Sequence, residues 1–521
     1  MQLRPHSPSV PARLFVAAIG LVLLFAASSL ALAAPARPNI LLILADDLGY
    51  SDLGCYGGEI ETPNLDKLAG AGVRFSQCYN TARCWPSRAA LLTGYYAQQV
   101  GRDEIPGAGG GGSGHRPKWA RLLPDFLQAG KYRSYHSGKW HVDDMPLAGG
   151  FHRSYRVDDQ DRHFSPHVHY LDGRKLSPVE PDTGYYATIA IADHAIKCLE
   201  EHARDHADAP FFEYLAFTCP HFPVQAPAED IARYRGRYAK GWDALRAARH
   251  ERTRKLCLVN CELSPRTEGI PAWESLDSAT QEAWQRRMEV HAAMVDRMDR
   301  EIGRVLDVLR KQGTLDKTIV LFMSDNGASA ERVLRGDGND PDAPPGSARS
   351  FLCIEPPWAN LANSPLRKSK IFVHEGGIST PLIIHWPAGL AARGSVYESP
   401  VHFIDIAPTL LEWAGVEKPR EWESISIPDA PGRSFASSLT RNEPFKHDWL
   451  WWFHSGNRAY RIGDWKIVSA GNSGPWELYN LASDRAESHN LAAAEPGRVA
   501  EMSQAWEARL KEFHATRDPE P

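Results

Sequence analysis

The sequence predicts an α/β fold, in which helices cover a large sheet, followed by a small antiparallel sheet toward the C-terminus. Apolar runs of strand length, such as residues 40–44, are continuous rather than alternating, which is typical of strands buried on both faces. Helical patterns lie between these runs, and this alternation favours an α/β sandwich. After about residue 420, short aromatic runs separated by turn residues indicate the antiparallel sheet.

Each strand-like run ends in polar residues. Residues 40–44 are followed by Asp46 and Asp47, residues 211–217 by His221, and residues 319–323 by Asp325 and Asn326. In sheets of this type, ligands bind beyond the carboxyl ends of the strands. We therefore expect these polar side chains to lie in one crevice.

Two helical patterns complete the main sheet unit. Apolar residues at three- and four-residue steps from Val290 to Leu309 predict a long helix that Gly313 ends, with its methionines filling the core. Residues 123–132 read as another helix, closed by Gly130. Residues 105–117, 335–350 and 232–266 read as loops or insertions. The glycine-rich first of these is not a phosphate-binding loop, because no Lys-Ser/Thr pair or helix start follows it.

The N-terminus has the pattern of a secretory signal. Arg4 and Arg13 precede an apolar run over residues 14–32 that ends in "LALAAPA", so we expect cleavage near Ala34 and export to the periplasm or the medium. An uncleaved membrane anchor is the alternative. We expect domains at 1–34 (signal peptide), 35–420 and 421–521. The formal net charge of −5 argues against a nucleic-acid-binding protein.

The chain contains eight cysteines, which in an exported protein would permit up to four disulfides. Their spacing shows no zinc pattern. If Cys84 is reserved for chemistry, seven remain, so at least one is unpaired. Cys257 and Cys261 form a plausible bridge only if the backbone allows it.

Asp46, Asp47, Asp325 and Asn326 offer only oxygen ligands, three of them anionic. A hard divalent cation requires such ligands, and Ca²⁺ suits a flexible all-oxygen set better than Zn²⁺. Either pair alone is more often a turn or a helix cap. Together, after parallel-type strands, the two pairs predict a metal site.

The stretch "RCWPSRAALLTG" places Cys84 at the start of a predicted helix. Pro86 suits a first helical turn, so backbone N–H groups and the helix dipole favour an anion near Cys84, and Arg88 adds a positive charge. A thiolate, or a bound sulfate or phosphate, would be stabilised there. A purely structural buried cysteine would leave Arg88 unexplained.

The chain resembles the formylglycine-dependent (type I, arylsulfatase-like) sulfatases of the alkaline phosphatase superfamily. "CWPSRAALLTG" is similar to their signature C-x-P-S-R-x-x-L-L-T-G, in which a maturation enzyme oxidises the cysteine to formylglycine (3-oxoalanine). Further family-like segments occur in family order between about Arg37 and Leu491: "RPNILLILADDLGYSDLGCYGG", "TPNLDKLAGAGVRF", "GKWH", "SDNG", "HEGGISTPLIIHWP" and "WELYNLASDRAESHNLA".

This resemblance implies a three-layer α/β/α sandwich with a large mixed, mostly parallel sheet in the catalytic domain 35–420. A small α+β subdomain with a four-stranded antiparallel sheet and a helix would occupy 421–521. It also implies a set of site residues: Asp46, Asp47, Asp325, Asn326 and modified Cys84 on one Ca²⁺; Arg88 and Lys139 on the sulfate oxygens and the aldehyde hydrate; His141 as base; His221 and Lys370 facing the leaving-group oxygen.

The rival interpretations of these residues are structural. A lone His141 or His221 is more often a core or surface histidine. Lys370 follows Ser369, where many family members carry glycine, and has Arg367 and Lys368 close by, so its assignment is the weakest.

The implied reaction is hydrolysis of sulfate monoesters. One hydroxyl of hydrated formylglycine attacks sulfur and displaces the alcohol, which leaves a sulfated enzyme. The second hydroxyl, deprotonated by His141, then expels sulfate. A serine could form the ester but lacks that second hydroxyl. His221 would protonate the leaving group, which matters most for sugar alcohols.

We expect sulfated carbohydrates as natural substrates and a formylglycine-generating enzyme as partner, with no nucleic acid and no stable membrane insertion after signal cleavage. The oligomeric state is not predicted. The glycine-rich segment and residues 335–357 are expected to shape the substrate entrance. The alternatives are a phosphate or phosphonate ester hydrolase of the same superfamily, or a non-catalytic sulfated-glycan binding protein whose Cys84 is never converted.

Overall fold

The largest element of the computed structural model is a ten-stranded sheet with the order β11-β2-β10-β9-β1-β8-β4-β5-β6-β7. The strands are β1 (Asn39–Ala45), β2 (Val73–Phe75), β4 (Arg133–Lys139), β5 (Arg153–Val157), β6 (His169–Leu171), β7 (Arg174–Lys175), β8 (Phe211–Ala216), β9 (Thr318–Ser324), β10 (Leu382–His385) and β11 (Ser395–Tyr397).

The centre of this sheet is parallel. β1 pairs in parallel with β8 and β9, with Ile40 opposite Phe212 and Ile319, and β4 pairs in parallel with β8 and β5. β10 runs antiparallel to β9 and β2, and β6 runs antiparallel to β5. The sheet is therefore mixed and mostly parallel, which confirms the predicted fold class.

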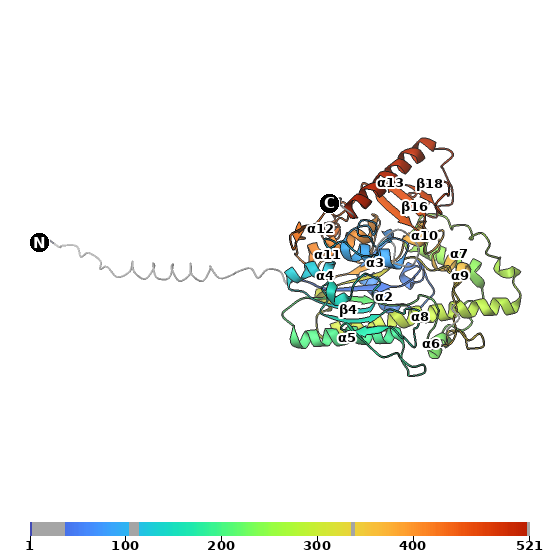
Figure 1. Cartoon of the computed structure of the whole chain (residues 1–521), viewed down its shortest axis with the longest axis horizontal. Helices are drawn as coiled ribbons and strands as arrows, with labels where there is room; N and C mark the ends of the chain where they lie inside the picture. The colour runs from blue at the N-terminus through green and yellow to red at the C-terminus, as the bar shows by residue number, and fades with distance from the viewer. Residues whose placement is uncertain (3–36, 104–113, 335–338, 518–521) are drawn as a thin grey trace. The chain divides into compact units, whose positions relative to one another are not determined.

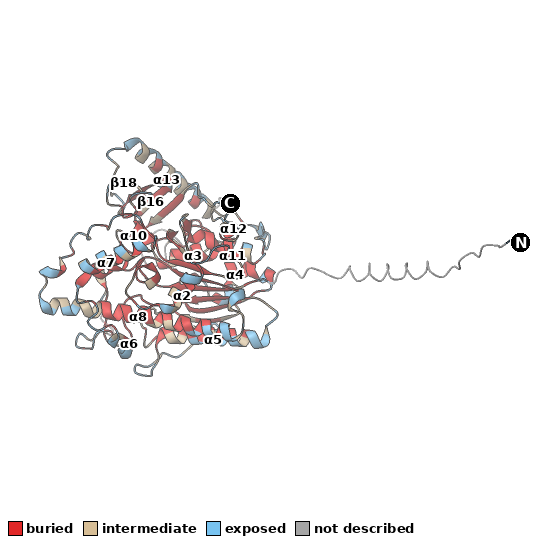
Figure 2. Ribbon diagram, turned by 180° about the vertical axis from the view of Figure 1, so that it is seen from behind, coloured by how far each residue is buried: buried red, intermediate tan, exposed pale blue. Residues whose placement is uncertain are grey.

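Both faces of the sheet are covered. In β1, Leu41 and Ile43 enter one hydrophobic core, whereas Ile40, Leu42 and Leu44 enter the other. Continuous apolar runs follow from this, because neither face of the strand meets water. α5 and α8 lie on one side of the strands and α3, α4 and α11 on the other (Figure 1). The central strands of the sheet are buried between helices whose outer faces are exposed (Figure 2).

The α-helices of the described residues are α2 (Pro63–Ala71), α3 (Cys84–Thr93), α4 (Leu123–Leu127), α5 (Ala187–Asp205), α6 (Ala228–Ala232), α7 (Gly241–Lys255), α8 (Ser278–Lys311), α9 (Glu355–Ala362), α10 (Glu375–Ile378), α11 (Ile406–Trp413), α12 (Ala436–Arg441) and α13 (Pro496–Arg517). α8 begins before the start of the apolar pattern from which it was predicted. The side chain of Asp277 caps this earlier start, because it accepts a hydrogen bond from the backbone N–H of Thr280. α4 is shorter than predicted, since a 3₁₀ turn (Gln128–Gly130) follows it.

The sequence predicts a loop or an insertion at residues 232–266, and the expectation of a loop is wrong. This region contains α7, a helix of 15 residues. Its arginines read as a solvated stretch in the sequence, but Arg249 is fully buried and pairs with Asp52 at 2.7 Å and with Glu59 at 2.7 Å. Trp242 fills the core beside it. Ion pairs with distant residues therefore stabilise a helix that the composition of this region does not indicate.

The C-terminal region forms a second, four-stranded antiparallel sheet with the order β15-β16-β17-β18 (Leu450–His454, Asn457–Ile462, Trp465–Ser469, Glu477–Asn480). α13 packs on it through Trp506, whose ring stacks on Trp451 at 5.5 Å. This confirms the predicted small sheet with a helix. Short pairs join β3 (Cys78–Tyr79) to β12 (Val401–His402) and β13 (Glu421–Trp422) to β14 (Ile425–Ser426). The boundary at residue 420 stays a prediction.

The structure describes residues 1–2, 37–103, 114–334 and 339–517. The signal-peptide prediction, most of the glycine-rich segment and residues 335–338 lie outside these ranges. None of the helices within them has the length and apolar character needed to cross a membrane. All eight cysteines are described, and all are unpaired.

Candidate active site

The polar residues singled out in the sequence lie at the carboxyl edge of the sheet. Asp46 and Asp47 follow β1, Asp325 and Asn326 follow β9, and Lys139 is the last residue of β4. Because these strands are parallel, their ends meet at one edge. All five side chains are buried.

Each of the three carboxylates is paired with a buried cation. Lys139 Nζ lies 2.5 Å from Asp46 Oδ2, Lys370 Nζ lies 2.9 Å from Asp47 Oδ2, and Arg88 Nε and Nη2 lie 2.9 and 2.8 Å from Asp325 Oδ2. The third guanidinium nitrogen of Arg88 donates to the backbone carbonyl of Lys139 at 2.9 Å. The structure thus brings six of the expected site residues into one network.

The pKa values of the carboxyls differ because their surroundings differ. Burial, followed by the charge of Asp46, raises the pKa of Asp325 to about 6. Burial alone would also raise the pKa of Asp47, but Lys370, the neighbouring His221 and Lys139 outweigh it and lower that pKa well below its usual value. Asp47 is therefore ionised, and three acidic side chains lie together in a buried site.

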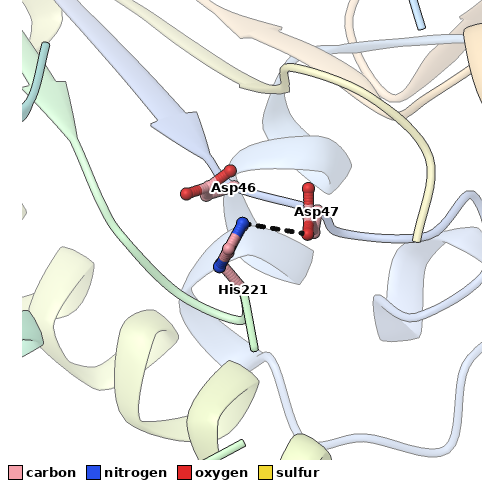
Figure 3. Close-up of side chains that lie close together, drawn as sticks. All are labelled: Asp46, Asp47 and His221. Carbon is pink, nitrogen blue, oxygen red and sulfur yellow. Dashed lines mark ion pairs between the residues drawn. The ribbon is translucent and has the colours of Figure 1, made fainter. Parts of the chain in front are cut away.

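The oxygens of this cluster suit a cation. Within the described part of the chain, Asp46 Oδ1 and Asn326 Oδ1 are buried and accept no hydrogen bond, although buried oxygens normally have a partner. Asn326 donates from Nδ2 to Asp47 Oδ1 at 2.7 Å, so its amide bonds to Asp47 through the nitrogen and not through Oδ1. Asp46, Asp47 and His221 also offer ligand atoms within 4.8 Å of one another (Figure 3). The residues fit a hard divalent cation.

Cys84 is the first residue of α3, and only 2% of its surface is exposed. The first backbone N–H groups of a helix have no intrahelical partner, so the N-terminal end of α3 favours an anion beside Cys84. His141 Nδ1 lies 3.2 Å from Cys84 Sγ. Burial, then the charges of Lys139 and Arg88, lowers the pKa of His141 well below its usual value. Its imidazole is therefore neutral and can accept a proton from a group at position 84.

His221 lies on the segment after β8 and is buried. Its Nδ1 donates to the carbonyl of Phe222 at 2.6 Å, which leaves Nε2 without a proton in the neutral ring. Nε2 lies 3.7 Å from Asp47 Oδ2 (Figure 3). Lys370 Nζ lies over the Phe222 ring at 5.3 Å, so His221 and Lys370 reach Asp47 from neighbouring positions.

The structure adds four residues that sequence reasoning missed: Arg83, Trp85, Glu331 and His454. Glu331 joins the site through 3.0 Å contacts with both Lys370 and Arg83. The Trp85 ring lies edge-on to His141 at 6.4 Å and to His454 at 5.8 Å. Arg83 and Trp85 flank Cys84, so their proximity was visible in the sequence. Nothing in the sequence marks Glu331 or His454.

The insertion after β9 packs against the His221 segment. The Val224 N–H donates to the carbonyl of Leu352 at 2.7 Å, and Gln225 Nε2 donates to the carbonyl of Ser350 at 2.8 Å. Phe222 and Cys353 line a small cavity together with Asp47. The described part of this insertion therefore borders the site, and its effect on substrate access stays a prediction.

The family comparison covers most of the chain. Residues 38–416 match the family model described as sulfatase. Residues 368–516 match a model described as the C-terminal region of N-sulphoglucosamine sulphohydrolase. The first match alone spans well over half of the 521 residues.

Curated relatives agree with the family match. An uncharacterized sulfatase of Schizosaccharomyces pombe is 33% identical over 518 residues, covering 90% of this chain and 93% of its own. An arylsulfatase of Klebsiella aerogenes is 33% identical and covers 73% of this chain and 87% of its own. An N-acetylglucosamine-6-O-sulfatase of Bacteroides thetaiotaomicron is 27% identical, with 92% and 87% covered.

Solved structures share the fold. The crystal structure of Ps i-CgsB superposes with a TM-score of 0.67 at 25% identity and covers 91% of this chain and 93% of its own. The family match and the relatives at 33% identity decide the family. The chain belongs to the sulfatases, type I enzymes of the alkaline phosphatase superfamily, and it is an enzyme that hydrolyses sulfate esters.

Proposed function

We propose that this sulfatase acts on sulfated carbohydrates through Cys84 converted to formylglycine, with one Ca²⁺ held by Asp46, Asp47, Asp325, Asn326 and the modified residue 84. The observation that carries the proposal is the position of Cys84 at a helix N-terminus, 3.2 Å from a neutral His141, in a buried site where Asp46 Oδ1 and Asn326 Oδ1 have no hydrogen-bond partner among the described residues. A structural cysteine needs none of these neighbours.

Ca²⁺ and formylglycine would supply chemistry that the encoded side chains lack. When bound, Ca²⁺ would offset the charge of the sulfate oxygens and of the nucleophilic hydroxyl. Hydrated formylglycine would present two hydroxyls on one carbon, one to attack sulfur and one to release sulfate afterwards. The chain's own task is to hold the ester and to move protons.

Binding of the sulfate group falls to the buried cations. Arg88 and Lys139 lie at the metal cluster, while Lys370 lies on the side of His221. Their donors are fixed by Asp325, Asp46 and Asp47, so little reorganisation is needed when an anion arrives. Hydrogen-bond donors that are held in place in a buried site usually make the largest single contribution to stabilising the transition state of group transfer.

Proton transfer falls to the two histidines. His141 Nδ1 faces residue 84 and is placed to take a proton from it. Burial, then the charge of Lys370, lowers the pKa of His221 well below its usual value. A bound sulfate ester would bring negative charge close to Nε2 and so favour the protonated imidazolium, and Nε2 could then pass a proton taken up from water to the leaving oxygen. We propose His221 and Lys370 as the groups that face the leaving alcohol.

The relatives support a proposal for the substrate class. One relative is named for N-acetylglucosamine 6-O-sulfate hydrolysis, and Ps i-CgsB has been crystallised with k-i-k-neocarrahexaose. We propose a sulfated sugar unit as the substrate here. We also propose that residues 1–34 direct export, so that the enzyme meets its substrate in the periplasm or outside the cell.

The test of this function compares 4-nitrophenyl sulfate, 4-nitrophenyl phosphate and a panel of sulfated monosaccharides. The protein is coexpressed with a formylglycine-generating enzyme. We expect sulfate esters to have the higher kcat/KM. Faster cleavage of the phosphate would assign the chain to phosphate ester hydrolysis, and no turnover of any ester would favour a sulfated-glycan binding protein.

Replacing His221 by asparagine should separate substrates by leaving group. Asparagine can still donate to the Phe222 carbonyl, but it cannot protonate an alcohol. We expect kcat on N-acetylglucosamine 6-sulfate to fall about 10²- to 10⁴-fold, the usual share of general acid catalysis. The rate on 4-nitrophenyl sulfate should fall far less, because 4-nitrophenolate leaves without a proton. Equal losses on both substrates would remove His221 from this role.

A further inference from the structure

The hairpin of β15 and β16 touches both segments that carry the proposed leaving-group and nucleophile residues. Trp452 Nε1 donates to the carbonyl of Asn80 at 2.8 Å, four residues before Cys84. Asn457 Nδ2 donates to the carbonyl of Ile371 at 3.1 Å, next to Lys370. The C-terminal sheet therefore has direct contacts with the active-site frame.

Ile371 has an unusual backbone. Its φ is 81°, in the left-handed region. A β-branched side chain at positive φ is a true outlier, and such strain persists only where surrounding contacts hold it. Ile371 is only partly buried, so packing of its own side chain is a weak reason for this conformation.

Hydrogen bonds hold Ile371 on both sides. Its N–H donates to the carbonyl of Ala82 at 2.9 Å, and its carbonyl accepts from Asn457. The preceding N–H, that of Lys370, donates to the carbonyl of Ala328 at 3.1 Å, on the loop that follows β9. The Lys370 backbone is thus tied to the segment before Cys84 and to the segment after Asn326.

Asn457 is built for this contact. It is 4% exposed, and its Nδ2 also donates to the carbonyl of His454 at 3.1 Å. Its Oδ1 accepts from the Gly471 N–H at 3.1 Å. The turn of the hairpin fixes the amide, so Asn457 presents its donor to Ile371 with little freedom to move.

We propose that Asn457 is a positioning residue for Lys370: it holds Ile371 in the left-handed conformation that sets where Lys370 leaves the backbone. The proposal rests on the proposed role of Lys370 at the leaving alcohol. It makes the C-terminal sheet part of the catalytic apparatus, since β16 acts on the reaction through one amide group.

The test starts from Asn457→Ala, with rates expressed per converted Cys84. Lys370 would act on charge that develops in the transition state, so kcat should fall and KM should change little. We expect kcat on N-acetylglucosamine 6-sulfate to fall about tenfold, a size in the range of the strain that left-handed non-glycine residues carry. A loss confined to thermal stability would assign Asn457 a purely structural role.

Rescue by glycine distinguishes positioning from general damage. Glycine adopts positive φ without steric cost, so Ile371→Gly added to Asn457→Ala should restore most of kcat. Ser424→Gly is the matched control, because Ser424 also has a positive φ, of 65°, but lies in the exposed turn between β13 and β14. Rescue by Ser424→Gly, or none by Ile371→Gly, would overturn the proposal.

Hydrogen exchange gives a readout that does not depend on activity. The Ile371 amide is bonded to Ala82, and Asn457→Ala should accelerate its exchange relative to the amides of β16. Unchanged exchange at Ile371 would contradict the proposal even if wild-type protein cleaves no sulfate ester. A wild-type protein that cleaves no sulfate ester would overturn the proposed function, but it would leave the positioning of Ile371 by Asn457 standing.

Discussion

Cys84→Ser is expected to abolish steady-state turnover of 4-nitrophenyl sulfate while leaving the fold intact. A serine hydroxyl can attack sulfur, but it has no second hydroxyl to expel sulfate. The variant should therefore release no more than about one 4-nitrophenolate per protein molecule and then stop, as expected for a nucleophile whose ester cannot break down. Cys84→Ala should release none. Stopped-flow absorbance and intact mass measure both outcomes.

The matched control is Cys198→Ser. Cys198 is also buried, but it lies in α5 beside His194 and away from the site. It should keep the wild-type rate per converted Cys84. Sustained turnover by Cys84→Ser at a rate near that of the wild type would show that a single hydroxyl suffices, and the formylglycine proposal would fail.

Removal of calcium should have the second large effect. Asp46, Asp47 and Asp325 lie together in a buried site, where burial and the charge of Asp47 raise the pKa of Asp46, and burial and the charge of Asp46 raise the pKa of Asp325. A bound cation offsets this repulsion, so chelation should lower kcat by at least about 10³-fold and lower Tm. At a Ca²⁺ concentration of 100 times Kd, bound metal stabilises the fold by about 2.7 kcal/mol. Activity after dialysis against a chelator, and differential scanning fluorimetry, check this.

Variants show whether the cation binds at the proposed residues. Asp46→Asn removes the charge of a carboxylate whose Oδ1 atom has no hydrogen-bond partner among the described residues. This variant should abolish the rise in Tm on Ca²⁺ addition. Glu213→Gln is the control, because Glu213 is equally buried but bonds to Ser137 in the sheet interior. It should keep the full rise. An equal response in both variants would place the cation elsewhere.

The layout of the catalytic unit follows from local sequence. The apolar run of β1 is continuous because the strand lies between two cores, and the residues that follow it meet those of β9 because the strands are parallel. Pro86 marks the first turn of α3, which begins at Cys84, one turn before Arg88. These features need only strand length, periodicity and helix-start chemistry.

Other parts depend on contacts between distant segments. Glu331, His454 and Asn457 reach the site only through the folded chain, as do the ion pairs that stabilise α7. Lys370 was assigned from the resemblance alone, and its neighbour Ile371 has a backbone that no propensity predicts. Tertiary structure overrides local preference at these positions.

The most direct test of the central claim plots the rate of 4-nitrophenyl sulfate hydrolysis against the fraction of Cys84 converted to formylglycine. Peptide mass spectrometry measures this fraction, since conversion removes one sulfur and two hydrogens and adds one oxygen. Coexpression with different amounts of the maturation enzyme varies it. We expect the rate to be proportional to the converted fraction and to reach zero with it. Full activity in protein that retains the Cys84 thiol would contradict the claim.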